Sequence, residues 1–222
     1  MVPKGKKKIP GPTSQPLPAQ DQPKEEDNGP LFFYMPDAKN GELCQWYPSR
    51  FTVGKAHISK LVGRVVDETD PDSDITFTCA EQFMMYCKAA RFGDTARQAR
   101  ILATTNPKEQ KQLGKGTEGF TDASWDEVKS AVVEAGNIAK FGQNLGLRRK
   151  LLATGGRVLC EAASRDRVWG IGYSEKHAMA HGRHWGENRL GKALMVARDV
   201  LQREDNDGEG EKSWEMEEDD AS

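Results

Sequence analysis

Residues 80–92 read AEQFMMYCKAARF and open the helical part of the chain. Phe83, Met84 and Tyr86 recur at helical spacing, and Gly93 marks the expected end of the segment. The sequence therefore predicts a helix here.

Glu81 and Lys88 of this helix are the first candidates for chemistry. They are seven residues apart, which is two helical turns, so both are expected on one face. In apolar surroundings burial raises the pKa of a carboxyl and lowers that of an amine. Such a pair suits a general acid and a nucleophilic amine, but the same spacing also fits a surface acid and base too far apart to pair.

Capping signals place further helices around this one. Asn106 and Pro107 predict a helix start and Gly114 its stop, and Ser124 with Glu127 fits a capping box. The final helix shows an apolar stripe, formed by Leu190, Leu194, Ala197 and Leu201. Short apolar runs such as LFFYMP at 31–36 predict strands, but helices outnumber them. The predicted fold class is mainly α, a single compact multihelical domain with a few short β-strands.

The two ends of the chain differ from this body. Residues 1–30 are rich in Pro, Gly and Lys, and residues 204–222 hold ten acidic side chains against one lysine, so both are predicted to be disordered tails. The predicted domain spans 31–203. Since residues 1–30 carry five lysines against four acids and the chain totals −2, the body carries about +6. A cationic body suits phosphate-bearing ligands, although the acidic tail could equally balance it.

Three of the four histidines lie close together in EKHAMAHGRHWGENRLGKALM, residues 175–195. His177, His181 and His184 could supply metal ligands, but Gly182 interrupts the helix that would align them and no HExxH motif is present. We expect exposed side chains on a loop, with no metal and no cofactor. A GxGxxG match at 114–119 follows a charged helical segment and not a strand, so we interpret it as a loop.

The four cysteines are scattered, with no CxxC pair, which favours a reducing compartment. The sequence shows no apolar stretch long enough to span a bilayer, so a membrane partner is not expected. The predicted location is cytoplasmic, with the Lys-rich run at 4–8 leaving a nuclear alternative.

The run EAASRDRVWGIGYS at 161–174 combines a carboxylate with an aromatic. Asp166 precedes Trp169 by three residues, and Gly170 and Gly172 permit close backbone approach. The pair could bind a flat base and polarise a sugar. It could equally be a turn with a core tryptophan.

Together these motifs resemble the NADAR family, also called YbiA-like, over roughly residues 32–202. The resemblance lies in an ordered set of segments: FFYMP (32–36), WYPSRF (46–51), CAEQFMMYCKA (79–89), NPKEQKQLG (106–114), KFGQN (140–144), LLATGGRVLCEAASRDRVWGIG (151–172) and GENRLGKALMVARDVL (186–201). It implies a mainly helical domain that cleaves N-glycosidic bonds. Implied substrates are ribosylamine-type riboflavin-pathway intermediates and ADP-ribose on guanine bases, so the expected partner is a nucleotide or ribosyl phosphate, or ADP-ribosylated nucleic acid.

The resemblance also implies site residues. The catalytic candidates are Glu81, Lys88 and Asp166. The substrate-binding candidates are Phe32, Tyr34, Trp169, Asn188 and Gly191. Many bacterial members have Glu-His where this chain has Glu81-Gln82. This departure and the long tails keep a second hypothesis open, a domain that binds ADP-ribose or modified nucleic acid without cleaving it.

Overall fold

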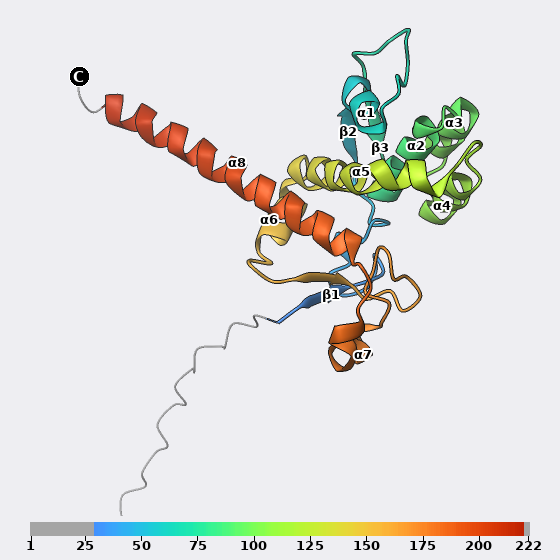
Figure 1. Ribbon diagram of the computed structural model, residues 1–222. Coiled ribbons are helices and arrows are strands. Elements are labelled where there is room, and N and C mark those ends of the chain that lie inside the picture. Colours follow the sequence, from blue (N-terminus) through green and yellow to red (C-terminus); the bar gives the residue numbers. More distant parts are fainter. Residues whose placement is uncertain (1–28, 220–222) are drawn as a thin grey trace, which may run out of the picture.

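The computed structural model describes residues 29–219, with side chains described through Asp207. The predicted extension before residue 29, with its Lys-rich run, lies outside the described residues. The domain is built mainly from helices (Figure 1). The helices are α1 (Lys55–Val62), α2 (Ala80–Arg91), α3 (Thr95–Ala103), α4 (Pro107–Lys115), α5 (Asp122–Gly142), α6 (Leu145–Leu152), α7 (Glu175–Ala178) and α8 (Arg189–Asp219), with 3-10 turns η1 (Gly41–Leu43) and η2 (Met179–His184). The predicted mainly α class with few short strands is confirmed.

Four short strands form two separate two-stranded sheets within the described residues. β1 (Leu31–Phe33) pairs in parallel with β4 (Leu159–Glu161), and β2 (Phe51–Gly54) pairs antiparallel with β3 (Asp74–Phe77). The first pair joins segments that are more than a hundred residues apart in sequence. It therefore holds the start of the domain beside the loop that follows β4.

Helix α2 lies at the centre of the core. Every residue from Ala80 to Ala90 is buried, because α3, α4 and α5 pack around it. Phe83 contacts Phe51 and Phe77 through edge-on rings, which ties the helix to the β2–β3 sheet. The interpretation of residues 81 and 88 as a surface acid and base is therefore wrong.

Two predicted helix boundaries need correction. Asn106 caps α4 as expected, but the helix continues past Gly114 to Lys115. Gly114 is a packing position, since a Cβ there would collide with the side chain of Met85. The capping box at Ser124 is wrong, because Thr121 caps α5 and accepts the Ser124 N–H.

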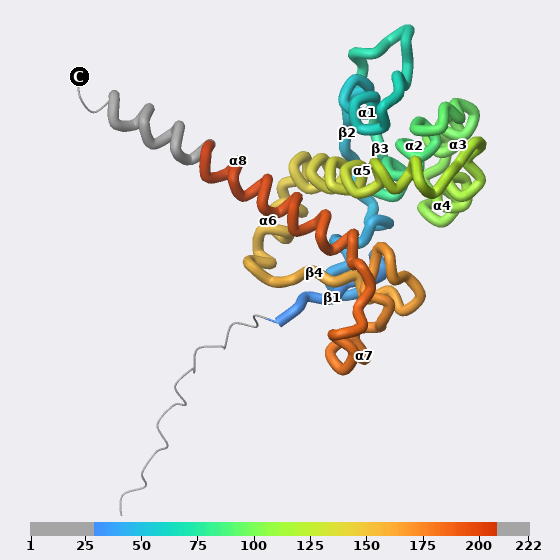
Figure 2. The backbone as a smooth tube through the Cα atoms, viewed as in Figure 1, coloured from blue at the N-terminus to red at the C-terminus, as the bar shows by residue number. Residues whose placement is uncertain are grey.

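Helix α8 packs along α5 and then extends away from the body (Figures 1 and 2). Its predicted apolar stripe is buried, as expected. The predicted domain limit at residue 203 falls inside this continuous helix. Arg148 forms ion pairs with Glu204 and Asp205, so acidic residues assigned to the tail contact the body.

All four cysteines are buried and none forms a disulfide. None of the helices in the described part of the chain is both long and apolar enough to cross a bilayer.

Candidate active site

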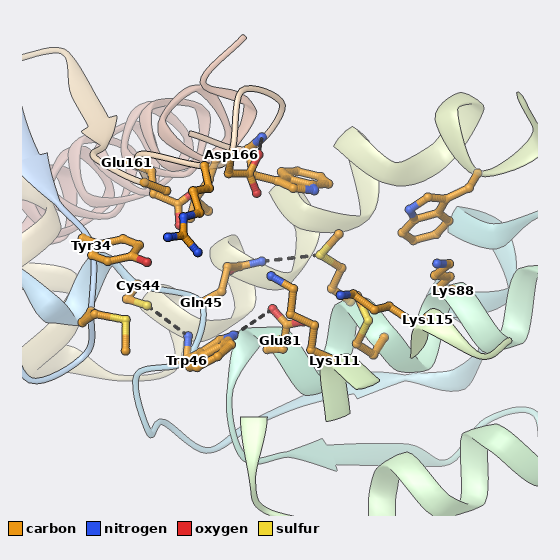
Figure 3. Close-up of a pocket in the computed structure, with 18 residues that line it drawn as sticks. Tyr34, Cys44, Gln45, Trp46, Glu81, Lys88, Lys111, Lys115, Glu161 and Asp166 are labelled. Carbon is orange, nitrogen blue, oxygen red and sulfur yellow. Dashed lines mark hydrogen bonds between the residues drawn. The ribbon is translucent and has the colours of Figure 1, made fainter. Parts of the chain in front are cut away.

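A pocket of about 430 Å³ lies between α2, α4, the segment after η1 and the loop after β4. Figure 3 shows Glu81 and Lys88 on α2, with Glu161 and Asp166 on the opposite side of the pocket. Lys111 of α4 lies close to Glu81 in this view. The structure thus brings the three predicted catalytic side chains to one cavity.

Glu81 is held at the first turn of α2 from two directions. Its backbone N–H donates to the Gln45 carbonyl oxygen at 3.0 Å, and Trp46 Nε1 donates to Glu81 Oε2 at 3.3 Å. Only 5% of the residue is exposed. Burial raises the pKa of this carboxyl to about 7, against the opposing charge of Lys111 and the Trp46 hydrogen bond. Glu81 can therefore hold or release a proton near neutral pH.

Lys88 lies two turns further along the same face of α2. Its Nζ is 3.8 Å from the centre of the Phe120 ring, a cation–π contact. Burial lowers the pKa of this amine; Asp122 acts in the opposite direction and Lys115 in the same one. The lowered pKa increases the fraction of neutral amine that is available for nucleophilic chemistry.

Asp166 and Trp169 also line the pocket, and a tight turn links them. Asp166 Oδ1 accepts the N–H groups of Val168 at 2.9 Å and Trp169 at 2.8 Å. The carboxylate therefore fixes the loop that carries the indole. Tyr34 lines the pocket beyond the end of β1, with 48% of the residue exposed.

Three predicted substrate-binding residues are not in the pocket. Phe32 packs edge-on against Trp185 at 6.0 Å, in a separate small apolar cluster. Asn188 donates to the Leu159 carbonyl oxygen at 2.8 Å, and a Cβ on Gly191 would collide with that same oxygen. Asn188 and Gly191 therefore hold the start of α8 close against β4, which is a structural role.

Several residues that line the pocket were not predicted from the sequence to have a role. These are Trp46, Lys111, Lys115, Trp125, Glu161 and Arg165. Glu161 has the most unusual environment of these: burial, followed by the charge of Asp166, raises the pKa of its carboxyl to about 7. An acid in the apolar run VLCEAA (158–163) is a signal that could have identified it.

Gln82 faces away from the pocket. Its Oε1 accepts the Thr78 N–H at 2.7 Å, and its Nε2 donates to the carbonyl oxygens of Ile101 at 2.9 Å and Thr104 at 3.0 Å. The side chain therefore ties α2 to the end of α3. The departure from Glu-His therefore falls at a position whose side chain does not line the pocket in this chain.

The three clustered histidines are exposed, as predicted, but they lie on α7 and η2 and not on a loop. His181 stacks on Tyr173 with 4.7 Å between ring centres. Among the described residues, no group of three or more His, Cys, Asp or Glu side chains is arranged to hold a metal ion.

A buried lysine supports the wall of the pocket from behind. Lys140 is fully buried, and its Nζ donates to the carbonyl oxygens of Glu42 at 2.7 Å and Cys44 at 3.0 Å. Burial lowers its pKa to about 8. These two hydrogen bonds hold the segment after η1 in place. That segment carries Trp46, which donates to the Glu81 carboxylate.

Replacing Lys140 with Met should destabilise the protein and weaken the site. The Glu42 carbonyl oxygen loses its donor, whereas the Cys44 carbonyl oxygen keeps the Tyr47 N–H at 3.2 Å. An unsatisfied buried polar group costs about 1–3 kcal/mol. Urea unfolding and steady-state kinetics should show a loss of that size and a reduced rate. Lys150→Met is the matched control, since this half-exposed lysine pairs with the Glu42 carboxylate at 3.4 Å and should cost less than about 1 kcal/mol. Equal losses in the two variants would contradict the assignment.

The raised pKa of Glu81 also predicts a pH-dependent stability. Its ordinary value is 4.5 and its folded value about 7. Between these values the folded protein keeps a proton that the unfolded chain has lost, so this group makes the free energy of unfolding fall as pH rises. Glu81→Gln should therefore be more stable than wild type at pH 8, by up to about 3 kcal/mol. The advantage should vanish near pH 4. Urea unfolding at both pH values tests this, and a pH-independent difference would contradict it.

Comparison with known proteins identifies relatives over most of the chain. N-glycosidase R617 of Acanthamoeba polyphaga mimivirus is 36% identical over 129 residues, which cover 57% of this chain and 76% of that protein. N-glycosidase YbiA of Escherichia coli K12 is 33% identical over 116 residues, 52% of this chain and 67% of YbiA. The riboflavin biosynthesis protein VVA0006 of Vibrio vulnificus YJ016 is 28% identical over 173 residues, 78% of this chain but 39% of that protein.

The fold has a relative among solved structures. The NMR structure of E. coli YbiA superposes with a TM-score of 0.59 and 25% identity, covering 80% of this chain and 88% of YbiA. The NADAR domain profile matches residues 32–202, which is well over half of the chain. The chain therefore belongs to the NADAR domain family.

Proposed function

We propose that this pocket hydrolyses the N-glycosidic bond of a ribosylated or ADP-ribosylated substrate. Family membership and the N-glycosidase relatives R617 and YbiA support the reaction class, a glycosidase acting on N-glycosyl compounds. The observation that carries the proposal is the buried Glu81 carboxyl, which titrates near neutral pH in a pocket with further carboxyls, lysines and aromatic rings.

Cleavage of an N-glycosidic bond calls for a proton donor and for a surface that binds the base. Breaking the bond between a sugar and a base develops positive charge on the sugar ring, and the leaving nitrogen must gain a proton. Glu81 can donate that proton, because a carboxyl with a pKa of about 7 is partly protonated at neutral pH. Trp169 and Tyr34 offer aromatic surfaces for the base.

The cations of the pocket favour a phosphate-bearing substrate. Lys111, Lys115 and Arg165 line the cavity, and residues 31–203 carry a positive net charge. Two substrates fit this chemistry: an ADP-ribosyl group on guanine in nucleic acid, and a riboflavin-pathway ribosylamine phosphate. The similarity to the riboflavin biosynthesis protein VVA0006 supports the second class.

The non-cleaving alternative loses one of its two motives, which were Gln82 and the long tails. The Gln82 side chain bonds the end of α3 and does not line the pocket. A domain that only binds has no evident need for a buried carboxyl whose ionisation is disfavoured.

The test is release of free base. Purified protein is incubated separately with DNA carrying ADP-ribosylated guanine and with the riboflavin-pathway ribosylamine phosphate, and products are identified by mass spectrometry. We expect base release from at least one substrate with wild-type protein. Binding of either compound with no product from both would contradict hydrolysis and support the non-cleaving alternative.

A further inference from the structure

We propose that Glu161, and not Asp166, is the second catalytic carboxyl of the pocket and works with Glu81 as an acid–base pair. This inference rests on the proposed N-glycosidase function and assigns a role within it. The structure shows that the two candidate acids have different hydrogen-bond partners.

Asp166 already has a bonding role in its own loop. One of its carboxylate oxygens accepts two backbone N–H groups, those of Val168 and Trp169. An oxygen used in this way holds the turn and the indole in place. Asp166 is therefore a positioning residue, and its negative charge also raises the pKa of Glu161.

The Glu161 carboxylate, in contrast, has an oxygen without a hydrogen-bond partner in the described part of the chain, while its backbone is held by hydrogen bonds. Its Oε2 is buried and has no hydrogen-bond partner among the described residues. Its backbone N–H donates to Asn188 Oδ1 at 3.1 Å, and its carbonyl oxygen accepts the Ile171 N–H at 2.9 Å. A buried unpaired oxygen costs stability, and it is expected where a ligand supplies the missing partner.

The position of Glu161 relative to Glu81 supports a shared reaction. The two acids come from opposite walls of the pocket, β4 and α2 (Figure 3). The charge of Lys111 lowers the pKa of both, and the charge of Glu81 adds to the rise at Glu161. Both carboxyls titrate at about pH 7, so neutral solution contains a state with one proton on the pair.

That singly protonated state can carry out the hydrolysis with a balanced proton count. The protonated carboxyl gives its proton to the leaving nitrogen as the C1′–N bond breaks and its electron pair moves to nitrogen. The ionised carboxyl takes a proton from the water whose oxygen bonds to C1′. If Lys88 holds that carbon as an imine, the C1′–Nζ bond then breaks and its electron pair returns to Nζ, which frees the lysine. The pair ends with one proton again, so the cycle needs no other reactant.

Two isosteric variants separate the roles of the acids. Glu161→Gln should lower kcat about 10²-fold with little change in KM and should remove one limb of the pH–rate profile. Asp166→Asn should lower kcat less than about tenfold, because the amide oxygen can still accept both N–H groups. It should keep both limbs but move one to lower pH, because the charge that raises the pKa of Glu161 is gone. Thermal melts of both variants check that the fold is retained.

A third variant tests for a missing carboxylate directly. Glu161→Ala leaves space for a small acid, so added formate should restore part of its rate and should not restore Asp166→Ala. A folded Glu161→Gln with nearly wild-type turnover, while wild type is active, overturns only this inference. The inference is also overturned if Asp166→Asn lowers kcat as much as Glu161→Gln does and loses the same limb of the pH–rate profile. A wild-type protein that releases no base overturns the proposed function and this inference together.

Discussion

Glu81→Gln is expected to reduce base release by about 10²–10⁴-fold while the protein stays folded. Gln matches the carboxyl in shape, and its amide oxygen can still accept the Trp46 Nε1–H that holds the side chain in wild type. It cannot supply or remove a proton at the leaving nitrogen. The loss should therefore lie in kcat, with KM changed much less.

The measurement needs a matched acid outside the pocket. Glu127→Gln is suitable because this glutamate pairs with Arg91 on the surface, with 66% of its side chain exposed. It should keep wild-type kinetics. Unfolding curves must accompany the rates, and Glu81→Gln should be the more stable protein at pH 8. If it is folded and turns over at close to the wild-type rate, Glu81 is not the catalytic acid.

Lys88→Arg is expected to cause a loss comparable to that of Glu81→Gln. Burial lowers the pKa of the Lys88 amine, which favours a neutral nucleophile that can add to C1 of a ring-opened sugar. Arginine keeps the positive charge but has no amine and stays protonated. If Lys88 acted only by its charge, the arginine variant would keep substantial activity.

Borohydride reduction during turnover gives an independent readout of the same step. A substrate-dependent adduct should form and map to the peptide that contains Lys88, not to those with Lys111 or Lys115. Lys150→Arg controls for the substitution itself, because that lysine is half-exposed on α6. An active enzyme that gives no adduct would exclude the imine and leave Lys88 with an electrostatic role.

The sequence by itself determined the elements whose physics is local. The periodicity of residues 80–92 placed Glu81 and Lys88 on one face of a helix, because that face depends only on the 3.6-residue repeat. Asn106 and Pro107 marked the start of α4, because capping satisfies N–H groups within one turn. The family motifs likewise brought Asp166 and Trp169 into the candidate site, and they line the pocket.

Other features of the site were decided by contacts between distant segments. Whether Glu81 was a surface acid or a buried one stayed open until α3, α4 and α5 were packed around α2. Phe32 carried an aromatic ring suited to stacking, but its contact with Trp185 directs it to another cluster. Glu161 lies across the pocket from Glu81 only because the β1–β4 pairing and Asn188 fix its strand there. Burial and the resulting pKa depend on every neighbouring segment at once, whereas a local pattern specifies only which face of its own element a residue occupies.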